Sequence, residues 1–419
     1  MNWQPHKLGE FISIKHGWAF KGEYFSDSGK YILLTPGNAH ETGGLKLRPG
    51  KEKYYLGEFP PDYLMKTGDM LVVMTDLIQA APILGGAIVV PEDDRFLHNQ
   101  RLGLVELLPH AEIDKGFLYY LLNSPGYRSQ VRGSATGATV RHTAPKRICD
   151  CNVLVPDTVE EQQQVAFVLS AYDDLIATNQ RRIALLEDAA RRLYREWFVH
   201  LRFPGHESVP VKDGVPEGWR KTPIAEQTSF LNRGIAPKYD DAAKGRVINQ
   251  KCIRDGRISM EPARRQSKDV KPDRLVQMGD VLINSTGAGT LGRVAQVRAP
   301  IDDCTVDTHV TIARPIDEGS WTYFGQALLN LEPVFSEMGK GATNQLELSR
   351  SDIGAVEIWL PPQHLHAEFE RLVGPMLVQA EQLSVANLSL EKARDLLLPK
   401  LMSGQLDVSG IALPDEVAA

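Results

Sequence analysis

Two long stretches of the chain, residues 165–197 and 369–401, place apolar side chains at alternating steps of three and four positions. This spacing aligns the apolar side chains along one face of an α-helix and is typical of a coiled coil. The two rows stay in register at a separation of 204 positions, as between Leu169 and Val373. The pattern therefore predicts two long helices that belong to two copies of a duplicated unit.

Shorter apolar runs precede each long helix. In the first half they predict strands at 69–74, 86–90, 102–107 and 152–155, with a short helix at 117–122. Parts of this pattern recur further along the chain: Gly279-Asp280-Val281-Leu282 repeats Gly68-Asp69-Met70-Leu71, and Gly341-Ala342-Thr343 repeats Gly137-Ala138-Thr139. We therefore expect an α+β fold with two similar domains in tandem, each followed by a long helix.

The two helices can bury both apolar faces by pairing with each other as an antiparallel coiled coil with pseudo-twofold symmetry. One register places Asn179 opposite Asn387, so that each buried amide has a partner, and allows Arg394 to stack on Tyr172. Pro375 is expected at a kink or at a fresh start of the second helix. The residues expected to pair the helices are Leu169, Ile176, Asn179, Ile183, Leu186, Leu193, Trp197, Phe369, Val373, Met376, Leu383, Asn387, Leu390 and Leu397.

Composition narrows the class of protein. The 419 residues are too many for one ordinary core, and 42% hydrophobic with 24% charged residues is usual for globular domains. The four cysteines make neither a zinc set nor a disulfide framework, and we find neither a secretory signal nor a membrane-spanning run. These features favour a cytoplasmic protein. The net charge of −6 argues against a protein that coats DNA, but it leaves room for local basic faces.

At this point the chain resembles the specificity (S) subunit of a type I restriction–modification enzyme. The resemblance covers nearly the full length and rests on the order of domain and long helix, on the Gly-Ala-Thr turns, and on two segments. Val215-Pro216-Glu217-Gly218-Trp219 opens the second unit, and Leu398-Pro399-Lys400-Leu401-Met402-Ser403-Gly404 closes the second helix. The first helix departs from this closing segment and reads Tyr194-Arg195-Glu196-Trp197-Phe198.

The resemblance implies two target recognition domains that each read one half of a split, asymmetric DNA sequence. It implies that the paired helices set the spacing and dock two methyltransferase (M) subunits, and that restriction/translocase (R) subunits complete the assembly. S-adenosylmethionine, ATP and Mg would then bind to these partner subunits and not to this chain, which would be no enzyme itself. The expected divisions are the first recognition domain at 1–156, the first long helix at 157–200, a linker at 201–216, the second recognition domain at 217–361, the second long helix at 362–404 and a tail at 405–419.

Local charge agrees with a DNA-binding role. From Arg128 to Arg147 there are five Lys or Arg residues and no acidic residue, and from Arg233 to Arg274 there are twelve against six. Solvated surface is the alternative for any single basic residue. Base edges are read by planar donors and acceptors, so exposed loops with such side chains are candidates.

The candidates in the first unit are Lys15, Trp18, Lys21, Gln79, Gln100, Arg101, Arg132, Thr139 and Arg141. Those in the second are Arg233, Lys238, Tyr239, Lys251, Arg254, Ser285, Thr286, His309, Lys340, Thr343 and Asn344. Some correspond in the repeat, since Thr75-Asp76 matches Ser285-Thr286 and Thr139 matches Thr343. Core packing for Trp18 and a structural role for His309 remain alternatives.

Catalytic motifs do not support an enzyme. The Gly-x-Gly-x-x-Gly at Gly287–Gly292 follows a strand, but the next residues, 293–297, alternate like a strand and would not form the helix that a dinucleotide site needs. We interpret it as a glycine hairpin. The favoured function is DNA recognition within a restriction–methylation complex. Three alternatives stay open: an orphan specificity chain, a protein-binding scaffold and, disfavoured by the lack of a nuclease motif, a fused nuclease.

Overall fold

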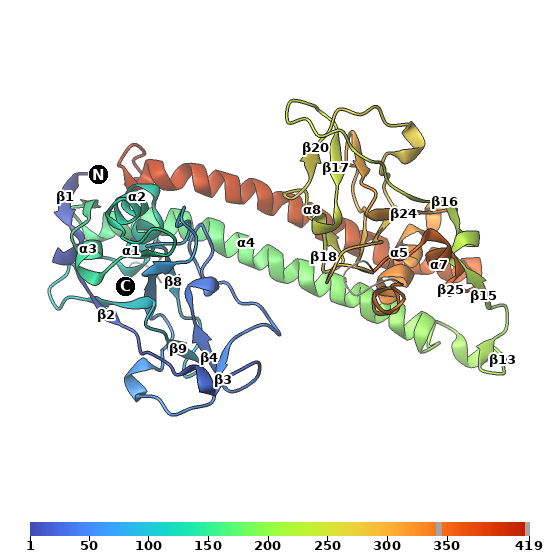
Figure 1. The fold of residues 1–419 in the computed structure, drawn as a ribbon, viewed down its shortest axis with the longest axis horizontal. Helices are drawn as coiled ribbons and strands as arrows, with labels where there is room; N and C mark the ends of the chain where they lie inside the picture. Colours follow the sequence, from blue (N-terminus) through green and yellow to red (C-terminus); the bar gives the residue numbers. More distant parts are fainter. Residues whose placement is uncertain (341–345, 415–419) are drawn as a thin grey trace. The chain divides into compact units, whose positions relative to one another are not determined.

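The computed structural model describes residues 1–340 and 346–414, and the chain forms two compact units (Figure 1). Unit 1 contains residues 1–176 together with the chain from 388 onward, and unit 2 contains residues 177–387. The fold is α+β with two long helices, and each helix begins in one unit and ends in the other. No helix of the described part is long and apolar enough to span a membrane.

Unit 1 is built from short strands and three short helices. Its central sheet has the order β2-β10-β6-β8, and a second sheet has the order β3-β5-β4-β9. The elements are β1 (Trp3–Lys7), β2 (Ile12–His16), β3 (Phe25–Ser26), β4 (Tyr31–Leu34), β5 (Tyr54–Tyr55), β6 (Met70–Val73), β7 (Thr75–Asp76), β8 (Ala87–Val89), β9 (Phe96–His98), β10 (Leu102–Leu107), α1 (Lys115–Asn123), α2 (Pro125–Ser134), β11 (Arg141–His142), α3 (Pro145–Cys149) and β12 (Asn152–Pro156).

Local sequence explains several of these boundaries. β6 is buried at all four positions, as expected for an apolar strand in the interior of a sheet. Asp114 caps α1 by accepting a hydrogen bond from the Phe117 N–H at 2.7 Å. Ser124 caps α2, and Pro125 occupies its first position, where a missing N–H costs nothing. The strands and the helix predicted before the first long helix are confirmed.

Unit 2 repeats the topology of unit 1. Its central sheet has the order β16-β24-β21-β22, and a smaller sheet has the order β20-β17-β23. The elements are β13 (Val211–Lys212), β14 (Val215–Pro216), β15 (Arg220–Pro223), β16 (Thr228–Arg233), β17 (Arg246–Ile248), β18 (Ile253–Arg254), β19 (Arg257–Ile258), β20 (Arg264–Arg265), β21 (Val281–Asn284), β22 (Val294–Gln296), β23 (Cys304–Val306), β24 (Val310–Pro315), α5 (Trp321–Asn330), α6 (Glu332–Glu337), α7 (Arg350–Ala355) and β25 (Glu357–Leu360).

The repeated glycine turns have the same backbone geometry in both units. Gly68 and Gly279 have φ angles of +80° and +90°, which favour glycine. Their N–H groups donate to the carbonyls of Val90 and Val297, each at 2.8 Å. The parallel pair β4 and β9 also has its counterpart in β17 and β23. The sequence repeat thus marks equivalent turns of one topology.

The long helices are α4 (Val159–Tyr194), continued by a π-helical turn η5 (Arg195–Val199), and α8 (Gln363–Met402). Thr158 caps α4 by accepting from the Glu161 N–H at 3.2 Å. α8 runs through Pro375 as one helix, so the helix does not start afresh there, and the alternative of a kink stays a prediction. The side chain of Pro375 is exposed.

Contacts between α4 and α8 occur within each unit. In unit 2 the Asn179 side chain donates to Asn387 Oδ1 at 2.9 Å, and the rings of Trp197 and Phe369 are 5.8 Å apart. In unit 1 Arg394 does not stack on Tyr172, because its guanidinium pairs with Asp173 at 2.6 Å. Eight of the predicted pairing residues are buried: Leu169, Ile176, Asn179, Ile183, Trp197, Phe369, Val373 and Asn387. Leu397 is partly buried and packs on the core of unit 1. Leu186, Leu193, Met376, Leu383 and Leu390 are partly exposed.

Segments expected to be linker and tail are packed against the units. Phe203, in the expected linker, is buried in the core of unit 2 against Trp219. In unit 1 the side chain of Gln164 donates to the carbonyl of Ser409, and Val408 belongs to the core. Gly404 ends α8 with a φ of +70°, which explains why the closing segment finishes with glycine.

Candidate nucleic-acid interface

Each unit presents an exposed side chain from the same type of turn. In unit 1 the Asn99 Oδ1 atom accepts a hydrogen bond from the Arg101 N–H at 3.0 Å. In unit 2 the Asp307 Oδ1 atom accepts from the His309 N–H at 2.9 Å. Both turns follow the parallel strand pair of their unit, and both leave the second residue after the Asx exposed. We call them the 99–101 turn and the 307–309 turn.

A glycine crosses closely beneath each turn. A Cβ atom on Gly17 would lie 2.1 Å from the Asn99 carbonyl oxygen, and one on Gly234 would lie 1.9 Å from that of Val306. The following residues form parallel bridges, Trp18 with Asn99 and residue 235 with 307. Only glycine fits at these crossings, so the backbone holds each turn in a fixed position.

In unit 1 the structure brings several predicted residues together around the 99–101 turn. Gln100 and Arg101 line a cavity of about 260 Å³ whose other walls include Phe20, Phe25 and Lys53. Trp18, which bridges to Asn99 of the turn, is 41% exposed, and its ring centre lies 5.5 Å from that of Tyr63. The Lys15 ammonium lies over the same Tyr63 ring. Lys21, three residues after Trp18, is exposed. Gln79 lies in a different exposed loop, between β7 and β8.

A buried histidine supports the 99–101 turn. His98 is fully buried and its Nε2–H donates to the Leu102 carbonyl at 3.0 Å. Burial lowers the pKa of His98 to about 4. The imidazole therefore stays neutral at neutral pH and acts as a fixed donor at the base of the turn.

Acidification is expected to destabilise unit 1 through His98. Because its pKa is lower in the folded chain than the usual value near 6.5, the unfolded state binds the proton more tightly. The contribution is complete above about pH 6.5 and is lost as the pH falls towards 4, by up to about 1.4 kcal/mol per pH unit. Hydrogen exchange of unit 1 peptides between pH 7 and 5, corrected for intrinsic rates, measures this slope. A His98→Phe variant should show a shallower slope, and an equal slope in both proteins would contradict the assignment.

The basic cluster predicted at 128–147 is largely structural. Arg128 is buried, and its guanidinium donates to the carbonyls of Glu41 and Pro82, so its expected place on a basic face is wrong. Arg141 is half-buried and donates to the carbonyl of Arg132 at 3.0 Å. Arg132 is itself half-buried, whereas Thr139 is exposed. Arginines that satisfy buried carbonyls are held in place and contribute less to a DNA surface.

In unit 2 the hydroxyl of Thr286 lies 2.6 Å from Nδ1 of the exposed His309. Ser285 is a correction, because it is fully buried and its hydroxyl contacts that of Thr311 at 2.6 Å, out of reach of a base. The equivalences explain the error. The Ser285 N–H donates to the His309 carbonyl at 2.8 Å, just as the Met74 N–H donates to the Arg101 carbonyl at 2.9 Å. Ser285 therefore corresponds to Met74, and Thr286 corresponds to Thr75, one position from the expected alignment.

Two other predicted basic residues of unit 2 already have anionic partners. Arg233 pairs with Glu347 at 2.5 Å, and Lys340 pairs with Asp352 at 2.7 Å. Thr343 and Asn344 lie outside the described residues. These ion pairs reduce the charge that Arg233 and Lys340 can offer to phosphate.

Several basic residues of unit 2 gather around the sheet β20-β17-β23. Arg246 lies directly opposite Arg265 in the antiparallel pair, an arrangement that costs free energy unless an anion is near. The guanidinium of Arg264 stacks 3.5 Å from the ring centre of Tyr239. The predicted residues Lys238, Lys251 and Arg254 are also exposed. Arg246, Arg264 and Arg265 belong to the basic run at 233–274 but are not among the individual candidates from the sequence. The adjacent arginines of β20, Arg264 and Arg265, are the sequence signal that could have indicated them.

Comparisons with known proteins agree with this arrangement. Residues 1–188 match the family model of the type I restriction modification DNA specificity domain. The type I restriction enzyme MjaIX specificity subunit of Methanocaldococcus jannaschii is 26% identical over 322 residues, covering 73% of this chain and 72% of that protein. The HindI specificity subunit of Haemophilus influenzae is 21% identical over 97% of this chain and its own full length. The crystal structure of an S subunit from M. genitalium has the same fold, with a TM-score of 0.61, 17% identity and 96% of each chain covered.

The first 188 residues therefore match a DNA specificity domain, and unit 2 repeats the sheet topology of unit 1. More narrowly, the relatives that it matches are specificity subunits of type I restriction enzymes, and these matches support the same assignment for this chain.

Proposed function

We propose that this chain reads a bipartite, asymmetric DNA site, with one half-site read by each unit. The observation that carries the proposal is the repeated Asx turn, fixed by a glycine crossing in both units. The exposed side chains on the two turns differ, Gln100 and Arg101 in one and Thr308 and His309 in the other. Equivalent turns with different donors and acceptors would recognise different bases, and this accounts for an asymmetric site.

The proposal includes the arrangement that the family resemblance implies. Two target recognition domains are joined by an antiparallel coiled coil with pseudo-twofold symmetry, and this coiled coil sets the gap between half-sites. It docks two methyltransferase (M) subunits, and restriction/translocase (R) subunits join the assembly. S-adenosylmethionine, ATP and Mg would bind to those partner subunits, and the assembly would be cytoplasmic. The Asn179–Asn387 hydrogen bond supports the helix pairing, because a paired polar residue in an apolar seam selects one register.

Binding to duplex DNA is expected to weaken steeply with salt. The basic surface around β20-β17-β23 and the donors at both turns would displace counterions from phosphates. With about six phosphate contacts, affinity should fall by roughly 10³-fold between 50 and 200 mM salt. Fluorescence anisotropy of the chain, alone and with its M subunits, on duplex DNA measures the slope. A protein-binding scaffold of net charge −6 should not bind DNA in a salt-sensitive way. If this chain shows no salt-sensitive binding to duplex DNA, the proposal is overturned.

Inserting four residues in a long helix tests the role of the helices in spacing. Four residues add about 6 Å and a little more than one helical turn, so the helix face is nearly preserved. The expected result is a longer accepted gap between two unchanged half-sequences, as measured by mapping methylated sites in cells. Altered half-sequences with the original gap would contradict the spacing role.

A further inference from the structure

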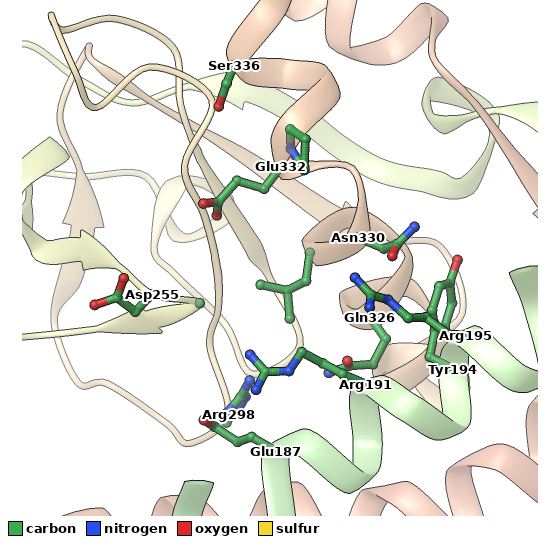
Figure 2. Close-up of a pocket in the computed structure, with 13 residues that line it drawn as sticks. Glu187, Arg191, Tyr194, Arg195, Asp255, Arg298, Gln326, Asn330, Glu332 and Ser336 are labelled. Carbon is green, nitrogen blue, oxygen red and sulfur yellow. Dashed lines mark hydrogen bonds and ion pairs between the residues drawn. The ribbon is translucent and has the colours of Figure 1, made fainter. Parts of the chain in front are cut away.

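Unit 2 contains a larger cavity that shares no lining residue with the candidate nucleic-acid interface. Its volume is about 450 Å³, within the usual range for small-molecule sites. Figure 2 shows the side chains that line it, which come from α4, η5, α5, α6 and two loops. We call it the α4–α5 cavity.

Two arginines four positions apart reach this cavity, Arg191 on α4 and Arg195 at the start of η5. Arg191 and Arg195 both line it, and both are exposed (Figure 2). Within the described part of the chain neither has a carboxylate at ion-pair distance, whereas the neighbouring Arg192 pairs with Asp188 at 2.6 Å. Arg195 is the first residue of the π-helical turn η5, a local widening that often marks functional positions.

The acidic groups of the cavity are mostly satisfied by other partners. The Glu187 carboxylate accepts from Arg257 at 2.6 Å and from Arg298 at 2.5 Å. Glu332 accepts a hydrogen bond from the Val294 N–H at 2.8 Å. Asp255, the third acidic residue of the cavity, is exposed, and none of the three acids forms an ion pair with Arg191 or Arg195 among the described residues.

Buried polar groups in the cavity lack partners. Gln326, on α5, is 2% exposed, lines the cavity, and makes no side-chain hydrogen bond to any described residue. The Nε atom of Arg298 is buried and also has no partner among the described residues. Buried polar groups are normally hydrogen-bonded, so an unpartnered amide that faces a cavity points to a ligand. Asn330 lies one turn further along α5, on the same side of the cavity (Figure 2).

We propose that the α4–α5 cavity binds a small phosphate ester of the size of a nucleoside monophosphate, with the phosphate on Arg191 and Arg195 and the remainder hydrogen-bonded by Gln326 and Asn330. A phosphate carries up to two negative charges and three acceptor oxygens, which suit two guanidinium groups. The cavity is larger than a phosphate ion requires, and the amides supply donors and acceptors for hydroxyl or ring groups. The ligand would bind to unit 2 whether or not DNA is present.

Titration of the full chain in phosphate-free buffer tests this inference. The probes are AMP, ribose 5-phosphate, inorganic phosphate and adenosine. Their binding is measured by calorimetry and by hydrogen exchange at residues 191–195 and 326–330. We expect AMP and ribose 5-phosphate to bind and to protect these peptides, and adenosine and inorganic phosphate to bind at least tenfold more weakly. Absence of binding by both esters at millimolar concentration, or equal binding by inorganic phosphate, would overturn the proposal.

Variants on the same helix provide the matched comparison. Arg191→Gln with Arg195→Gln should weaken AMP binding at least tenfold, since each removes a charged hydrogen bond. Arg192→Gln, which loses only an exposed ion pair, should bind AMP normally. Gln326→Leu keeps similar volume and should weaken AMP more than inorganic phosphate. Unchanged AMP affinity in the double arginine variant would overturn the assignment. Each variant should still bind DNA as the unmodified chain does. Loss of AMP binding can then be distinguished from a failure of the proposed DNA recognition.

Discussion

Replacing Glu187 by glutamine is expected to destabilise unit 2 by about 3 kcal/mol. The Glu187 carboxylate is bound by Arg298, whose side chain is only 6% exposed, and by Arg257. Burial acts to raise the pKa of Glu187, but hydrogen bonds from Arg257 and the charge of Arg298 outweigh it, and the pKa lies below the usual value. The carboxylate is therefore charged at neutral pH, and its removal leaves the buried Arg298 without a counter-charge.

The measurement is hydrogen exchange under native conditions, read on unit 2 peptides with unit 1 peptides as an internal reference. Asp188→Asn is the matched control, because Asp188 is the next residue on α4 and its one ion pair among the described residues is with the exposed Arg192. It should change stability by no more than about 0.5 kcal/mol. Replacing both Glu187 and Arg298 by methionine should restore most of the loss, since no buried charge remains. A loss below about 1 kcal/mol in Glu187→Gln would contradict the importance of this ion pair.

Truncating Arg101 to alanine is expected to relax recognition of one half-site and to leave the other unchanged. The 99–101 turn holds Arg101 exposed, and a bidentate arginine contact with a base is worth about 1–3 kcal/mol of discrimination. Affinity for the full site should fall roughly 5- to 150-fold at fixed salt. His309→Ala should relax the opposite half-site, because His309 occupies the equivalent position in unit 2.

Binding to a library of duplexes that vary one half-site at a time measures both effects. Arg95→Ala is the control, since Arg95 is an exposed arginine of unit 1 that pairs with Glu92. It should bind the library as the unmodified chain does. If Arg101→Ala weakens all sequences equally, Arg101 contacts phosphate and the base-reading role is refuted.

Features of this chain that depend on neighbouring residues can be predicted from its sequence, whereas features that depend on distant residues cannot. The helices at 165–197 and 369–401 and the repeated glycine turns could be predicted, because period and turn chemistry depend on neighbours in the chain. The burial of Arg128 and Ser285 could not be predicted from the sequence. Each of these side chains is satisfied by residues far away in sequence, the carbonyls of Glu41 and Pro82 in one case and the Thr311 hydroxyl in the other.

The same contrast applies to the candidate site. The sequence indicates Gln100, Arg101 and His309 as planar hydrogen-bonding groups in loops. Nothing in the neighbouring residues indicates that Arg101 and His309 occupy equivalent turns. That equivalence depends on the crossings of Gly17 and Gly234, which the fold brings under the turns. The α4–α5 cavity had no local signal, because its side chains come from separate elements.

By itself the sequence determined the duplication, the two long helices and the resemblance to a specificity subunit, since these follow from periodicity, spacing and short-range order. Only the tertiary structure decided which charged groups are free to meet DNA or a ligand and which are bound within the protein. The physical reason is that a charge is neutralised, or a polar group hydrogen-bonded, by whatever the folded chain places a few ångströms away, and that partner can lie at any distance along the sequence.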